Sequence, residues 1–202
     1  LLLVVSGCVT EYDFNDGSNA GWRTAGLYED GSLTPIPGFF SDAPAPWVDG
    51  QNSPGAPPAF DPLADGIGCI VLGSGGANLP QGPGGYWAWH FNSPDLSSKT
   101  NWQDLSEIKA DLVADMASAQ NSQVWAQFVV KIRKPDTTIS YYTDGVFHSL
   151  PINVSYASNS WQTLTLDMTS LGMPAGYTLL NINIRIFGHQ GGYDGFVLLD
   201  NV

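Results

Sequence analysis

The sequence predicts an all-β protein built as an antiparallel two-sheet β-sandwich. Segments in which apolar and polar residues alternate follow one another from residue 86 almost to the last residue, 202. Alternation places every second side chain on one face of a strand, whereas an amphipathic helix needs apolar residues three and four positions apart. Clusters of Gly, Pro, Asn and Asp separate these segments and mark turns. Seven or more strands without a helix bury their apolar faces by packing one sheet on another.

The length and charge of the chain narrow the range of functions. We expect residues 9–202 to form one domain, because β-sandwiches of this size commonly fold as a single unit. Seven Lys and Arg against 19 Asp and Glu give a net charge of −12. This charge repels phosphate backbones and anionic lipid surfaces, so we expect no nucleic-acid partner and contact with a membrane only through an anchor. It is compatible with neutral ligands, with bound calcium and with simple solubility.

The first eight residues are typical of an export signal. An apolar run over residues 1–5 ends at small residues immediately before Cys8, as the apolar region of a secretory signal does before its cleavage site. Residues 5–8 resemble a bacterial lipobox, so we expect residues 1–8 to be a signal-peptide remnant and Cys8 to carry lipid. The protein is then an exported lipoprotein of the cell envelope or outer membrane, or extracellular. The alternative is a short buried strand at this position.

The first expected central strand is the aromatic segment over residues 86–91. Trp87, Trp89 and Phe91 share one face of that strand and predict a wall of the core, since three large aromatic side chains would not stay exposed. Further strands are expected at residues 11–14, 67–72, 108–116, 124–132, 139–143, 146–150, 161–168, 179–187 and 196–202. The proline-rich residues 33–66 lack periodicity and predict a long loop.

Two local patterns predict finer features of the strands. Asp144-Gly145 between two alternating segments predicts a hairpin, because both central positions of a type I′ turn favour positive φ. In the segment at 179–187 we expect Leu180, Ile182, Ile184 and Ile186 to point inward. The last strand pattern still runs at Val202, so we expect the natural chain to continue beyond it.

The outward positions of the strands carry the side chains that a glycan-binding face needs. Neutral sugars stack an apolar ring face on aromatic side chains and pair their hydroxyls with amides, carboxylates and guanidinium groups. If their strands are neighbours in one sheet, the residues that project together are Asp111, Trp125, Gln127, Asn181, Asn183 and Arg185. We take Trp125, Gln127, Asp111, Asn183 and Arg185 as the candidate ligand-binding residues. The alternative is a solvated sheet face with its Trp covered by the proline-rich loop.

Several short motifs follow one another along the chain in the same order as in one class of β-sandwich. They are Phe14-Asn15-Asp16-Gly17, Gly21-Trp22, Gly85-Tyr86-Trp87, Ser93-Pro94 with Leu96, Ser160-Trp161-Gln162-Thr163-Leu164 and Leu199-Asp200-Asn201-Val202. This order resembles the galactose-binding-like jelly rolls, of the laminin IV (laminin B) type or of related bacterial carbohydrate-binding modules. The resemblance implies a jelly-roll fold and a non-catalytic extracellular adhesion or carbohydrate-binding module, whose partner is a glycan or an extracellular matrix-like polymer.

The same resemblance implies a structural calcium ion. In such modules calcium often lies where the acidic turn of the first strand meets the acid of the final strand. The matching positions are Asp16 and Asp200, with Asp13 as a third ligand. The alternative is that Asp16 caps a turn and Asp200 is exposed at a strand end.

Motifs that carry catalysis are absent from the sequence. His90, His148 and His189 lie on separate segments without metal-ligand spacing, and no Gly-x-Ser-x-Gly elbow occurs. We therefore expect no enzyme. Two alternatives stay open: a structural accessory domain of a larger secreted protein, and a polysaccharide-acting enzyme such as a glycoside hydrolase, which needs two carboxyl groups across a cleft.

Overall fold

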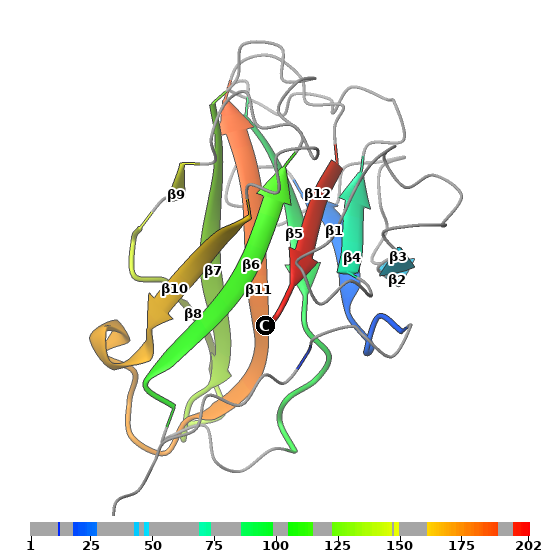
Figure 1. Cartoon of the computed structure of the whole chain (residues 1–202). Coiled ribbons are helices and arrows are strands. Elements are labelled where there is room, and N and C mark those ends of the chain that lie inside the picture. Colours follow the sequence, from blue (N-terminus) through cyan, green and yellow to red (C-terminus); the bar gives the residue numbers. More distant parts are fainter. Residues whose placement is uncertain are drawn as a thin grey trace, which may run out of the picture.

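Two antiparallel sheets lie face to face in the computed structural model and enclose the apolar core between them (Figure 1). The structure describes residues 12, 18–27, 43–44, 47–48, 69–73, 86–98, 105–114, 123–146, 148–149, 161–189 and 196–202. The first sheet contains β2 (Ala43–Pro44), β1 (Arg23–Leu27), β5 (Tyr86–Asn92), β11 (Thr178–His189), β7 (Gln123–Arg133) and β8 (Ile139–Tyr142) in that order, with β9 (His148–Ser149) also paired to β7. The second sheet contains β10 (Gln162–Asp167), β6 (Glu107–Ala114), β12 (Phe196–Asp200), β4 (Cys69–Gly73) and β3 (Trp47–Val48). The predicted two-sheet β-sandwich is confirmed.

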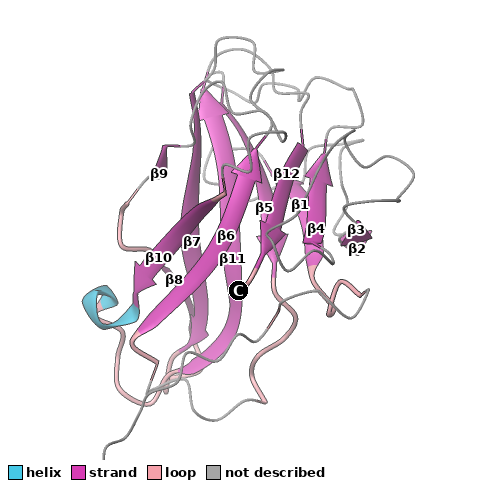
Figure 2. Cartoon of the chain, in the orientation of Figure 1, coloured by secondary structure: helices cyan, strands magenta, loops and turns pink. Residues whose placement is uncertain are grey.

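Strands and loops make up nearly all of the described chain (Figure 2). Within it, the one helical segment is the 3-10 helix η5 (Met168–Leu171), whose first turn is capped by Asp167, which accepts a hydrogen bond from the backbone N–H of Thr169 at 2.8 Å. Gly172 ends this helix in the left-handed conformation, with φ 61°. No helix among the described residues is long and apolar enough to cross a membrane.

The core takes every second residue of its strands, as the alternation predicts. On β7, Phe128 and Val130 are buried, whereas Val129 between them lies on the outer face and is half-buried. The expected central strand is also confirmed, because β5 lies between β1 and β11 and its Phe91 belongs to the core. The inner face of the second sheet contributes Ile108, Ala110, Leu112, Leu164, Leu166, Val197 and Leu199. The side chains of Trp87 and Trp89 lie outside the described part.

A bulge in β11 changes which of two leucines enters the core. The pairing of β11 with β7 shifts register between Leu179 and Asn181. An extra residue in one strand reverses the alternation beyond it, because successive side chains point to opposite faces. Leu179 is therefore fully buried and Leu180 only half-buried. The expectation that Leu180 points inward with Ile182 is wrong for this reason.

Asp144-Gly145 does not close a hairpin, so that prediction is also wrong. The strands on either side, β8 and β9, both pair with β7 and run along the same edge of it. Gly145 has the positive φ that the dipeptide predicts, 76°, but it lies in a bulge between two collinear strands. The hairpin turn between β7 and β8 lies at residues 134–138, where the N–H of Lys134 donates to the carbonyl of Thr138 at 2.8 Å.

The two ends of the described chain meet beside the core. The N–H of Tyr12 donates to the carbonyl of Val202, and the N–H of Val202 donates back, both at 3.0 Å. The ring of Tyr12 packs edge-on against the fully buried Trp22, with 5.6 Å between centroids. Of the strand expected at residues 11–14, only Tyr12 is described. The strand β1, which follows Trp22, has no counterpart among the predicted strands, because it is short and lacks alternation.

Candidate functional site

Side chains on the outer face of the first sheet lie in rows that cross the strands. Residues directly opposite one another on paired strands are neighbours on one face. Four rows follow one another along the sheet: Asn181, Lys131 and Tyr141; Asn92, Asn183 and Val129; His90, Arg185 and Gln127; and Ala88, Phe187 and Trp125. Successive rows are two residues apart, or ~7 Å at ~3.3 Å per residue. The first three rows are mainly polar, and aromatic rings lie at both ends of the set.

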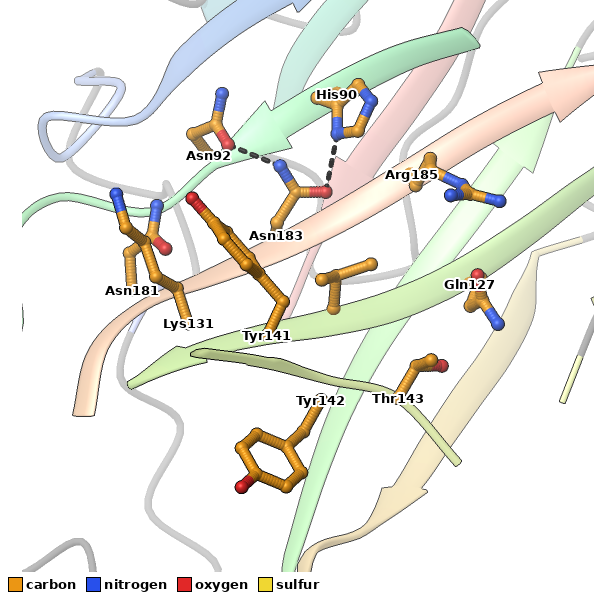
Figure 3. A pocket seen from close by; sticks show the side chains of 11 residues that line it. His90, Asn92, Gln127, Lys131, Tyr141, Tyr142, Thr143, Asn181, Asn183 and Arg185 are labelled. Atoms are coloured by element: carbon orange, nitrogen blue, oxygen red, sulfur yellow. Dashed lines mark hydrogen bonds between the residues drawn. The ribbon is translucent and has the colours of Figure 1, made fainter. Parts of the chain in front are cut away.

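The first three rows line a hollow of about 420 Å³ in this outer face (Figure 3). Tyr142 and Thr143, from β8 and the residue after it, complete the described lining. Gln127 and His90 are buried, at 3% and 5% exposure, whereas Tyr141 is 53% exposed. Since ligand pockets commonly measure about 300–1,000 Å³, the hollow is large enough for a small ligand or a segment of a polymer.

Two side-chain hydrogen bonds, drawn as dashed lines in Figure 3, join β5 and β11 at one side of the hollow. The amide nitrogen of Asn183 donates to Asn92 Oδ1, which leaves the amide oxygen of Asn183 to face His90. That oxygen is 2.7 Å from His90 Nδ1 and must accept the hydrogen bond. The proton of the neutral imidazole is therefore on Nδ1, and Nε2 keeps its lone pair. The network orients the amide of Asn183 and leaves Nε2 as an acceptor.

Burial keeps His90 in its neutral form. Burial lowers the pKa of the imidazole from 6.5 to about 4. The hydrogen bond that His90 donates to Asn183 raises this pKa, and the charge of Arg185 lowers it further. At neutral pH the charges on the described lining are therefore those of Lys131 and Arg185.

Aromatic rings contact both of these cations. Trp125 stacks on Phe187 with 5.7 Å between centroids and 28° between planes. The guanidinium carbon of Arg185 lies 4.5 Å from the centroid of Phe187, and the ammonium of Lys131 lies 5.8 Å from that of Tyr141. Cation–π contacts of this kind hold a charged group in place without neutralising it.

The structure brings four of the five predicted ligand-binding residues to one face. Gln127, Asn183 and Arg185 line the hollow. Trp125 lies one row beyond them and is half-buried. The alternation of β7 and β11 predicts this grouping because the two strands are direct neighbours.

Asp111 does not belong to this face, and its assignment to the site is wrong. Its strand, β6, is in the second sheet, so an outward position there points away from the hollow. The Asp111 carboxylate instead accepts hydrogen bonds from the hydroxyl of Thr163 and, at 3.1 Å, from Asn201 Nδ2.

Among the residues of the hollow that are missing from the predicted set are His90, Asn92, Lys131 and Tyr141. Alternation along β5 does place His90 on the face away from the core residue Phe91. Alternation along β7 places Lys131 on the same face as Gln127. What the sequence lacks is the pairing of β5 with β11 and of β8 with β7, which joins these positions to Arg185 and Asn183.

The predicted metal and lipid positions fall mostly outside the described residues. This is true of Asp13 and Asp16, and of Cys8, so calcium binding and lipid attachment stay predictions. Asp200 is described, and it is fully buried rather than exposed at a strand end. Its carboxylate accepts a hydrogen bond from the N–H of Asn201 at 2.9 Å. The described part of the chain holds no group of three or more His, Cys, Asp or Glu residues that could bind a metal ion.

No protein-family model matches the sequence, and no curated protein matches it. Solved structures do match the fold. A carbohydrate-binding module specific for non-crystalline cellulose, CBM28, is 14% identical with a TM-score of 0.55, over 98% of this chain and 94% of that chain. A structure from the β-sandwich superfamily of carbohydrate-binding modules, described in terms of promiscuous specificity, is 10% identical with a TM-score of 0.50, over 98% of this chain and 62% of that chain.

A third structure, CBM27-1 of Caldicellulosiruptor saccharolyticus in complex with mannohexaose, is 13% identical with a TM-score of 0.47, over 95% of this chain and 93% of that chain. Identities this low show the fold alone, and the first two structures carry that conclusion. The chain is similar in fold to carbohydrate-binding modules built as β-sandwiches.

Proposed function

We propose that this chain is a non-catalytic carbohydrate-binding module that holds a glycan along the outer face of its first sheet. The observation that carries the proposal is the order of the four rows, in which polar side chains lie between the ring of Tyr141 and the stacked pair of Trp125 and Phe187. Pyranose rings present an apolar face and a rim of hydroxyls, so they bind where aromatic rings and amides are combined. The first and fourth rows are ~20 Å apart, which fits an oligosaccharide segment.

The polar groups in the hollow suit sugar hydroxyls, which both donate and accept hydrogen bonds. Gln127 offers an amide, and His90 offers the acceptor Nε2, because its Nδ1 is already bonded to Asn183. Both side chains are buried, and His90 is also bonded to Asn183, so little side-chain freedom is lost when a ligand binds. The likeness of the fold to two carbohydrate-binding modules supports the same conclusion.

Loss of the aromatic platform tests this proposal. Trp125→Ala should weaken binding to a soluble polysaccharide by about tenfold or more, because large aromatic side chains dominate binding energy at such faces. The melting temperature should hardly change, since Trp125 is half-exposed on the outer face. Affinity gels cast with β-glucan, mannan, xylan or polygalacturonate measure the effect.

Trp161→Ala is the matched control, because it removes an indole that precedes β10 on the second sheet. It should migrate like the wild type in every gel. Equal retardation of Trp125→Ala and wild type would remove the stacking role, and a large drop in its melting temperature would make Trp125 a structural residue. Release of reducing ends from any of these polymers would contradict the non-catalytic assignment and favour a glycoside hydrolase.

We also propose that calcium joins the two ends of the module through Asp16 and Asp200, with Asp13 as a third ligand. Two observations support this: the carboxylate of Asp200 is fully buried, and the pairing of Tyr12 with Val202 brings the chain just before Asp13 beside the chain just after Asp200. Carboxylate and carbonyl oxygens are the ligands that Ca²⁺ prefers.

Chelation should therefore lower the melting temperature by roughly 5–10 °C. Calcium at 100 times its dissociation constant adds about 2.7 kcal/mol to the free energy of unfolding, and each kcal/mol corresponds to about 2–4 °C in a chain of this size. Thermal unfolding with calcium and with chelator measures the difference, and Asp200→Asn should abolish it. Identical melting curves of the wild type with calcium and with chelator would contradict the proposed calcium site.

A further inference from the structure

We propose that the glycan held on the outer face is acidic, and that its carboxylate or sulfate groups bind at Lys131 and Arg185. The inference rests on the proposed function and specifies the ligand class. A guanidinium group can also pair with the hydroxyls of a neutral sugar, but a neutral ligand gives no reason for several cations to gather on one face. Here two of only seven cationic residues line one hollow, in a protein whose net charge is −12.

The described lining of the hollow adds no carboxylate to these two cations. Its other members are amides, hydroxyls, phenols, a neutral imidazole and a valine. Arg185 lies directly opposite His90 on the paired strands β11 and β5, and its charge is one cause, after burial, of the lowered pKa of His90. An anion bound here would lie near two cations and no carboxylate of the described lining, in contrast to the negative charge of the protein as a whole.

The hollow continues past Lys131 into a second one of about 280 Å³ that also contains a cation. Lys131 and Asn181 line both hollows, and Arg133 lines the second. Asp95 is the one carboxylate on its described lining; it accepts a hydrogen bond from the N–H of Ser97 at 2.8 Å, and the charge of Arg133 is a further, smaller cause of its lowered pKa. Cationic side chains thus recur along the outer face from Arg185 to Lys131 and on to Arg133.

The spacing of the cations fits a charged polymer better than a single charged sugar. Arg185 and Lys131 are two rows apart, or ~13 Å at ~3.3 Å per residue, which exceeds the length of one pyranose ring. Asn183 lies in the row between them and can pair with hydroxyls there. The guanidinium of Arg185 suits two-point binding of a carboxylate or sulfate, and the ammonium of Lys131 acts as a compact point charge.

Pairs of polymers that differ only in charge test the proposal. The 202-residue protein should bind polygalacturonate more tightly than its fully methyl-esterified form if carboxylates are recognised, and dextran sulfate more tightly than dextran if sulfates are. Lys131→Gln should weaken binding to the charged polymer by about tenfold, as for the loss of one charge-assisted hydrogen bond. Arg185→Gln should do the same, and both variants should lose less affinity for the uncharged polymer than for the charged one.

Lys109→Gln is the matched control for charge. Lys109 lies on β6 in the second sheet, where its ammonium is 2.6 Å from the carboxylate of Glu107. Its replacement removes the same charge from the protein and should leave polymer binding unchanged. Lys131 is half-exposed on the outer face, so Lys131→Gln stays informative if Arg185→Gln lowers the melting temperature.

The outcomes separate this inference from the function on which it rests. Tighter binding of either charged polymer, lost in Lys131→Gln and kept in Lys109→Gln, supports an acidic ligand. Equal or tighter binding of the uncharged partners, of β-glucan or of mannan overturns the acidic class but keeps the carbohydrate-binding module. Binding of no polysaccharide at all would overturn the proposed function itself.

Discussion

Replacing Phe128 by alanine should lower the free energy of unfolding by about 3–5 kcal/mol. Phe128 is 1% exposed and lies in the core cluster between the two sheets, in register with the buried Ile184 of β11. Removing a buried aromatic ring costs its transfer free energy and adds the cost of the cavity that remains. Urea unfolding followed by intrinsic fluorescence measures the change as a shift of the midpoint at constant slope.

Val129→Ala is the control for this prediction, because Val129 is the next residue of the same strand and lies on the outer face. It should cost no more than about 1 kcal/mol, as expected for a half-exposed position away from the core. Comparable losses in the two variants would contradict the assignment of opposite faces of β7 to the core and to the candidate site.

Acidification should destabilise the protein between pH 6.5 and about pH 4 because of His90. The native imidazole has its pKa lowered to about 4 by burial, whereas in the unfolded chain it titrates near 6.5. Between these values the unfolded state binds the extra proton, so the free energy of unfolding falls as the pH falls. The full window corresponds to a loss of roughly 3 kcal/mol, and above pH 6.5 the effect vanishes.

His90→Gln isolates this contribution, since the amide can still donate to Asn183 but does not titrate. Chemical unfolding at several pH values should give a slope for the wild type that the variant lacks. Three aspartates with shifted pKa values titrate outside the window between pH 4 and 6.5. Hydrogen bonds from neighbouring Ser or Thr residues lower the pKa of each below 3.8; they are Asp95, Asp136 and Asp167. Equal slopes in the two proteins would mean that His90 is charged in the native state.

Alternation within one strand predicts faces well but does not predict which strands are neighbours. It separates Phe128 from Gln127 on β7 and Ile184 from Arg185 on β11, and these assignments agree with the structure. The same reasoning groups Asp111 with Gln127, because outward positions on β6 and on β7 have the same alternating pattern in the sequence. Membership of a sheet depends on pairing between distant segments, which leaves no local trace.

The other errors come from insertions of single residues and from turns. The bulge at Leu180 is invisible in a run of apolar residues, because leucine is acceptable on either face. Asp144-Gly145 satisfies the φ requirement of a hairpin turn and of an edge bulge alike, so only the pairing of β8 and β9 with β7 distinguishes them. Tyr141 enters the candidate site through that same pairing.

The placement of the last two strands has a consequence for how the molecule folds. β11 lies between β5 and β7, and β12 lies between β6 and β4, so both sheets are completed by strands from residues 178–202 (Figure 1). Contacts between residues so far apart in sequence are slow to form, because the entropy of closing long loops opposes them. Until β11 has been synthesised, the edges of β5 and β7 that pair with it keep unpaired backbone N–H and C=O groups, which favours aggregation of incomplete chains. The cooperative core, and with it the outer face that carries the candidate site, therefore assembles only once β11 and β12 are available.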